Sequence, residues 1–181
     1  MTRVSVHPSL ILWLSALGYL APRVLLPFLG AAALHELGHL LMLRRLGRMP
    51  RRLELRFSGA QLETPPLSYR QELLAASAGP LVSLLMGLLF PLAPYLAFYS
   101  VALGCFNLLP VPGLDGGRML RCALLLRLPP GRALRVVRWT GMVTALGIWG
   151  GALWLCCGLG MGVWPLLPAA LFLYKALSME E

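Results

Sequence analysis

Residues 31–43 read AAALHELGHLLML, so His35, Glu36 and His39 interrupt a stretch that is otherwise apolar. In a helix, His35 and His39 lie four residues apart and project from one face on successive turns. This spacing lets both imidazoles bind one Zn²⁺, while the Glu36 carboxylate can approach a water at the metal and accept its proton. A chance match to the motif is the alternative. Ionisable groups are costly in an apolar segment unless they have a function, which favours a metal site.

The composition of the whole chain predicts a membrane protein. Of its 181 residues, 58% are hydrophobic and only 13% are charged, and the mean hydropathy is +0.74. A soluble domain carries about a quarter charged residues, so this chain has too much apolar surface for water and needs a lipid bilayer around it. The net charge of +9 is typical of cytoplasmic loops in such a protein, and we expect no nucleic-acid partner. The four cysteines form no CxxC pair and are expected to be packing residues.

Six apolar segments predict an all-α polytopic membrane protein with about six transmembrane helices. They lie at about 9–22, 24–43, 71–90, 93–110, 139–158 and 161–177. The first is short, because a helix needs about 20 residues to cross the hydrocarbon core. If the N-terminus is inside, only Arg23 among the sixteen Lys and Arg residues lies outside. The positive-inside rule thus predicts a multi-pass protein of the cell membrane with its N- and C-termini in the cytoplasm.

The first cytoplasmic loop contains a candidate β-hairpin. Residues 53–62 begin with alternating apolar and polar side chains, and Gly59 then marks a turn. This alternation predicts a small hairpin, with an amphipathic surface loop as the alternative. The chain has neither internal repeats nor a second soluble domain, and we expect a single domain over 1–181 with its core at 24–120.

A catalytic zinc site needs a third protein ligand, and Asp115 is the candidate. It follows the fourth apolar segment in the sequence NLLPVPGLDGGR, residues 107–118, where Pro and Gly force an irregular backbone. Such backbone is tolerated at membrane depth only inside protein or beside a water-filled cavity. In the predicted topology, the second and fourth segments run in the same direction, so Asp115 and the two histidines are expected at one depth toward the cytoplasm. A helix cap or an ion pair with Arg118 is the alternative role for Asp115.

The two motifs together resemble the site-2 protease family of intramembrane zinc metalloproteases, peptidase family M50, which carries HExxH in one helix and N-x-x-P-x-x-x-L-D-G-G in a later one. The resemblance covers about 30–120 and is closest to the stage IV sporulation protein FB-like bacterial branch. It implies His35, His39 and Asp115 as the ligands of one Zn²⁺ per chain. It also implies Glu36 as the catalytic general base.

The resemblance implies roles for further residues around this site. Asn107 is expected to position the substrate, and Gly79-Pro80 to form a packing break near the metal. The chain departs from the family pattern at two positions, because many relatives have Pro where Gly113 stands and Asn where Ser83 stands. These departures affect the inference about substrate positioning rather than the inference about the metal.

The family implies a zinc metalloendopeptidase that hydrolyses a peptide bond within or next to a transmembrane segment of a membrane-associated protein substrate, in regulated intramembrane proteolysis. An edge strand at 53–62 would hold the unwound substrate by β-augmentation. We expect no PDZ or CBS domain, and we therefore expect a regulatory membrane partner or substrate supply to control the enzyme. The alternatives are an intramembrane metal transporter, which has no need of Glu36, and an inactive relative that binds helices.

Overall fold

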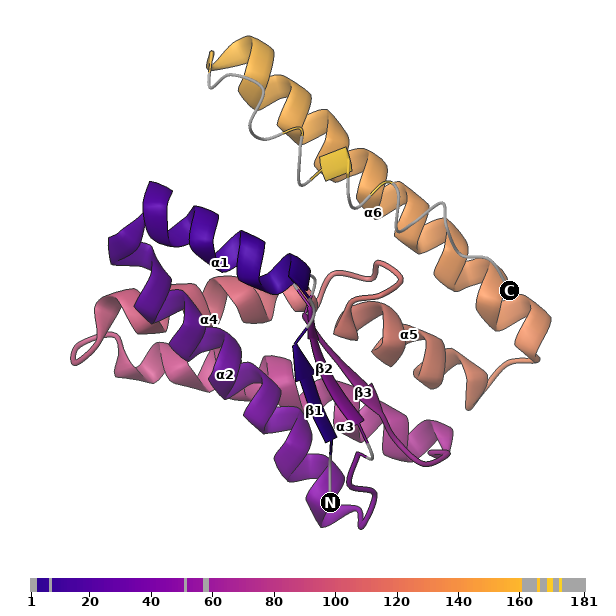
Figure 1. Ribbon diagram of the computed structural model, residues 1–181. Coiled ribbons are helices and arrows are strands. Elements are labelled where there is room, and N and C mark those ends of the chain that lie inside the picture. The colour runs from indigo at the N-terminus through magenta and orange to yellow at the C-terminus, as the bar shows by residue number, and fades with distance from the viewer. Residues whose placement is uncertain are drawn as a thin grey trace. The chain divides into compact units, whose positions relative to one another are not determined.

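The computed structural model describes residues 3–6, 8–50, 52–56, 59–160, 166, 169, 170 and 173, and most of these residues are helical (Figure 1). The mostly helical class predicted from the sequence is therefore confirmed. The chain divides into two compact units, Met1–Phe106 and Asn107–Glu181.

The first unit is built mainly from helices. In chain order these are α1 (Pro8–Leu20), α2 (Pro22–Arg45), α3 (Tyr69–Leu85), the 3₁₀ turn η1 (Met86–Leu89) and α4 (Pro94–Asn107), whose last residue begins the second unit. A capping box starts α3: the Gln71 backbone N–H donates to Ser68 Oγ at 3.3 Å, and the Ser68 backbone N–H donates to Gln71 Oε1 at 3.1 Å. The local sequence thus fixes where α3 begins.

Helices α2 and α3 pack against each other at a glycine. A Cβ on Gly38 would lie 2.7 Å from the carbonyl oxygen of Ala78, closer than side-chain carbons approach a carbonyl. Because Gly38 lies between the two histidines of α2, this close approach brings the α3 backbone to the face that carries them.

A three-stranded sheet completes the first unit. It contains β1 (Arg3–Val6), β2 (Arg52–Arg56) and β3 (Gly59–Glu63) in the order β1-β2-β3. Strand β2 pairs antiparallel with β3 and parallel with β1. The range predicted as a hairpin, 53–62, falls on β2 and β3, and residues 57 and 58 between them lie outside the described residues. The sequence analysis did not anticipate β1, because four residues carry too little periodicity.

The presence of β1 changes which strand can bind another chain. Strand β2 has a partner on each side, so an edge strand within 53–62 is β3 rather than β2. An added strand next to β3 would extend the sheet at its antiparallel side.

Three of the predicted spans coincide with helices that are long and apolar enough to cross a membrane. These are α2, α3 together with η1 (Tyr69–Leu89), and α6 (Pro130–Gly158). The 9–22 segment forms α1, which has 13 residues, and the 93–110 segment forms α4, which has 14. Both helices are shorter than the usual 20-residue span. Most of the sixth segment, 161–177, lies outside the described residues, so six spans stay a prediction.

The second unit contains α5 (Asp115–Leu125) and α6. Helix α5 was expected to be cytoplasmic loop, and α6 begins nine residues before the predicted apolar segment. Both differences have one cause: these stretches are rich in arginine, so hydropathy alone does not show them as helical. The buried cluster of this unit is Val111 and Leu114, with Leu109 and Ile148 packed against it.

Large apolar side chains remain exposed on the long helices. A soluble protein rarely exposes so much apolar surface, whereas a helix that faces lipid does so routinely. Examples on α2, α3 and α6 are Leu26, Leu41, Leu81, Leu85, Val143 and Leu146.

Candidate metal centre

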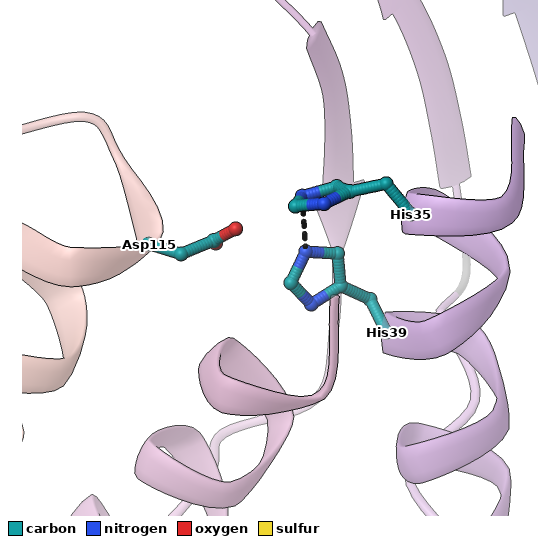
Figure 2. A group of neighbouring side chains, drawn as sticks. All are labelled: His35, His39 and Asp115. Carbon is teal, nitrogen blue, oxygen red and sulfur yellow. Dashed lines mark hydrogen bonds between the residues drawn. The ribbon is translucent and has the colours of Figure 1, made fainter. Parts of the chain in front are cut away.

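Helix α2 presents His35 and His39 on one face, as their spacing predicts (Figure 2). Both side chains are buried, with exposed fractions of 4% and 6%. Their ring centroids lie 4.9 Å apart and their planes cross at 80°. The two Nε2 atoms face each other at 3.2 Å. The structure therefore turns the same nitrogen of each ring toward one point.

The other nitrogen of each ring contacts α3. His39 Nδ1 lies 2.7 Å from the carbonyl oxygen of Ala75, and His35 Nδ1 lies 2.9 Å from Ser83 Oγ. A carbonyl only accepts, so His39 must donate its Nδ1–H, which leaves the Nε2 lone pair available in the neutral ring. A histidine that binds a metal commonly has its second nitrogen held in this way, because the hydrogen bond fixes the tautomer and the ring orientation.

The distance between the facing nitrogens fits a shared cation. Two nitrogens bound tetrahedrally to Zn²⁺ at its usual bond lengths lie about 3.3–3.4 Å apart, close to the 3.2 Å seen here. Two lone pairs that face each other at this distance repel unless a proton or a cation lies between them. The geometry and the nitrogen donors of this pair therefore fit Zn²⁺.

Gly79 makes room for the second histidine. A Cβ on Gly79 would lie 2.2 Å from His39 Nε2 and 2.5 Å from its Cε1, so any side chain here would displace the imidazole. Pro80 follows within α3 and is fully buried. The packing break predicted at Gly79-Pro80 thus lies directly against a proposed ligand.

Glu36 follows His35 on α2 and is half-buried. Successive residues of a helix are rotated by about 100°, so Glu36 projects beside the histidine face rather than from its centre. This position suits a group that acts next to a metal rather than on it.

Asp115 is the first residue of α5 and is 7% exposed. Its Oδ1 lies 3.7 Å from Arg118 Nη1, so the ion pair considered from the sequence is present at a long distance. The N-terminal end of a helix also favours a carboxylate, because the backbone N–H groups there carry partial positive charge.

Two glycines fix the backbone around Asp115. A Cβ on Gly116 would lie 2.1 Å from the Leu108 carbonyl oxygen, and one on Gly117 would lie 2.3 Å from that of Val111. The 108–112 segment therefore folds directly onto the first turn of α5. Only glycine fits at either position, which explains the double glycine after the aspartate.

Asn107 ends α4 and is half-buried, at the start of the loop that leads to Asp115. Within this loop Gly113 has a φ of 85°. Proline cannot take this angle, because its ring holds φ near −65°. The departure at position 113 from the Pro of many relatives therefore accompanies a distinct local backbone.

Sequence reasoning gave the histidines from their spacing but did not assign the groups that orient them. Ser83 was noted only as a departure from the family pattern. The Ala75 carbonyl belongs to the backbone, so no side-chain pattern could have revealed it.

Comparisons with known proteins point to a peptidase family. Residues 86–148 match the family described as Peptidase family M50. Over 98% of its length the chain is 31% identical to Rip3 of Mycobacterium tuberculosis, whose name classes it with the zinc metalloproteases. It is also 32% identical, over 52% of its length, to a zinc metalloprotease of Methanocaldococcus jannaschii. These matches relate the chain to peptidase family M50.

The fold of the chain is similar to that of a solved site-2 protease from Methanocaldococcus jannaschii. The TM-score is 0.71 at 22% identity, and the alignment covers 100% of this chain and 93% of the other. The chain spans 49% of the length of Rip3 and 32% of the length of the archaeal metalloprotease. Placement in the stage IV sporulation protein FB-like branch stays a prediction.

Proposed function

We propose that this chain is an intramembrane zinc metalloendopeptidase. It would hydrolyse a peptide bond within or next to a transmembrane segment of a membrane-associated protein, in regulated intramembrane proteolysis. The observation that carries the proposal is the buried pair His35 and His39 on α2, a helix apolar enough to span a membrane. Their facing Nε2 atoms and the hydrogen bonds from α3 support a metal there.

The ligand set of the proposal is His35, His39 and Asp115, with one Zn²⁺ per chain. Two imidazoles and a carboxylate are a donor set of catalytic zinc sites, which leave a position open for water or substrate. Figure 2 draws the three side chains of this proposed set. A carboxylate can keep a long contact with Arg118 through one oxygen while the other serves as a ligand.

In the proposed reaction, Glu36 accepts the proton of the attacking water and later delivers it to the leaving amine. The bound Zn²⁺ supplies Lewis acidity that makes water a nucleophile near neutral pH. Ser83 and Ala75 hold the two imidazoles in place, so that no reorientation of the rings is needed during the reaction. Asn107 positions the substrate.

The substrate must be unwound where it is cut, and β3 is the proposed docking strand. Neighbouring residues of a strand direct their N–H groups to opposite sides, so one of Gln61 and Leu62 donates away from β2. The test is a pair of single variants, Gln61→Pro and Leu62→Pro, because proline has no backbone N–H. The variant that loses the outward N–H should cleave substrate slowly while its zinc content stays normal. Normal cleavage by both variants would rule out β3 as the docking strand.

The enzyme is proposed to lie in the cell membrane as a multi-pass protein, with both termini and the active site toward the cytoplasm. A regulatory membrane partner would control access to it. Single cysteines introduced at position 2, at position 47 and within 91–93 test this arrangement with a labelling reagent that does not cross the membrane. The cysteine within 91–93 should react in intact cells, whereas those at positions 2 and 47 should react only after the membrane is opened.

Glu36→Gln is the decisive test of the activity. The full-length wild type and the variant are each co-expressed with tagged membrane substrates. The variant should cleave them about 100-fold more slowly or worse, since a general base contributes a factor of about 10²–10⁴ to the rate. Zinc content should stay near one per chain, because Glu36 is not a ligand in the proposal. Cleavage that survives Glu36→Gln would contradict a peptidase, and zinc uptake by wild type without cleavage would favour a transporter.

Zinc content of single variants tests the ligand set. His35→Ala, His39→Ala and Asp115→Ala should each lower bound zinc well below one per chain after dialysis. Arg118→Gln is the matched control, since it removes an ion-pair partner of Asp115 without removing a ligand. Stoichiometric zinc in Asp115→Ala would exclude that residue as the third ligand.

A further inference from the structure

The first part of α6 carries two cations and an aromatic ring on one face. We call Arg135, Arg138 and Trp139 the α6 arginine patch, and all three are exposed. With Met142 they line a hollow of about 310 Å³. Residues spaced by three and four share one side of a helix, so these side chains lie along one side of α6.

The arginine patch has no counterion in the part of the second unit that the structure describes. Asp115 is the only acidic residue there, and it forms an ion pair with Arg118. Arg135 and Arg138 are three residues apart, a spacing at which like charges on a helix repel. An anion between the two guanidinium groups would turn this repulsion into attraction, and guanidinium groups bind phosphate in a two-pronged geometry.

The position of the patch along α6 indicates which kind of anion it can bind. Arg138 is the last charged residue of α6, and residues 139–158 contain none. The exposed side chains that follow are apolar, with Val143 65% and Leu146 53% exposed. Tryptophan at such a border is typical of the membrane interface. The patch thus offers cations at headgroup level and an apolar continuation at the level of the acyl chains.

We propose that the α6 arginine patch binds an anionic phospholipid, with the headgroup phosphate between Arg135 and Arg138 and an acyl chain along Val143 and Leu146. Free phosphate would use only the cations, and an acidic protein segment would leave the apolar continuation uncovered. A lipid uses both. The site is independent of the proposed peptidase activity, since it involves none of the groups assigned to the metal.

Native mass spectrometry of the full chain in detergent tests the proposal by titration with phosphatidylglycerol and phosphatidylcholine. Wild type should bind phosphatidylglycerol in preference. Arg135→Gln/Arg138→Gln should weaken its binding by roughly 10- to 30-fold, since each basic residue near a membrane surface contributes about 1 kcal/mol. The matched control is Arg45→Gln/Arg70→Gln, which removes the same charge from two exposed arginines outside α6 and should bind as wild type does.

Several outcomes would overturn the proposal. Equal affinity of wild type for phosphatidylglycerol and phosphatidylcholine would overturn it. An equal loss of phosphatidylglycerol affinity in the two Gln double variants would overturn it as well. Displacement of phosphatidylglycerol by millimolar inorganic phosphate would indicate a phosphate site, and displacement by an acidic peptide would indicate a protein ligand. If the Gln pair does not fold, Arg135→Lys/Arg138→Lys keeps the charge but removes the two-pronged contact, so the preference for phosphatidylglycerol should weaken. An unchanged preference in this folded variant would overturn the binding of the phosphate between the two guanidinium groups.

Discussion

The two proposed halves of the metal centre are held in different ways. His35 and His39 lie on a regular helix, and hydrogen bonds from α3 orient both rings. Asp115 follows an irregular loop, and its position depends on backbone packed against backbone at Gly116 and Gly117. The difference shows that a helix sets the spacing of its ligands locally and leaves only their orientation to hydrogen bonds, whereas a loop needs close contacts that only glycine allows.

The largest effect is expected from Gly79→Ala, on the helical half. The new Cβ would lie 2.2 Å from His39 Nε2, so the imidazole must leave its position and zinc affinity should fall by about 100-fold or more. Competition with a chelator measures the affinity. Gly147→Ala is the control, because that helical glycine has open space around it and alanine favours a helix. Normal zinc affinity in Gly79→Ala would show that the two helices are not as tightly packed as described.

The loop half should respond to Gly117→Ala. A Cβ there would lie 2.3 Å from the Val111 carbonyl oxygen, which is backbone and cannot swing aside. The start of α5 must therefore shift, and the variant should lose both thermal stability and Asp115-dependent zinc binding. Gly150→Ala, in open space on α6, is the matched control. A loss of zinc with unchanged stability would mean that the loop moves without unfolding, which would sharpen the contrast with the helical half.

A smaller effect is expected from Ser83→Ala, which removes the group that holds His35 Nδ1. Loss of such an orienting partner costs about 10- to 100-fold in metal affinity or activity. Ser83→Thr keeps the hydroxyl and should restore part of the loss. Ser77→Ala is the control, because it removes an α3 hydroxyl that donates to the Leu74 carbonyl rather than to a histidine. If Ser83→Ala and Ser77→Ala bind zinc equally, Ser83 does not orient the ligand.

The smallest effect is expected from Gly113→Ala in the loop. Alanine at a φ of 85° costs roughly 1–2 kcal/mol, because its Cβ crowds the backbone in this conformation. Chemical unfolding should show this destabilisation, with zinc stoichiometry retained at low denaturant. Gly131→Ala, at the start of α6 with open space around it, should change stability little. Stability equal to wild type would indicate that position 113 can adopt another backbone conformation, as the proline of many relatives requires.

Much of the fold was predictable where the sequence has a strong period. The apolar runs gave α2, α3 and α6, because a 20-residue apolar helix needs no partner to be recognised. Strand β1 was missed because four residues carry little periodicity, and α5 was missed because its charged residues keep the mean hydropathy of its 11 residues low. The strand order narrowed the expected edge strand at 53–62 to β3, because β2 also pairs with β1, a segment distant in sequence.

For the candidate site, the sequence by itself determined the chemical groups and their spacing: His35, Glu36 and His39 on one helix, with Asp115 after an irregular loop. Only the tertiary structure decided which ring nitrogens face each other, since that depends on the Ala75 carbonyl and the Ser83 hydroxyl of another helix. The physical reason is that helical periodicity is a local property of the chain. Ring orientation is set by hydrogen bonds between segments more than thirty residues apart.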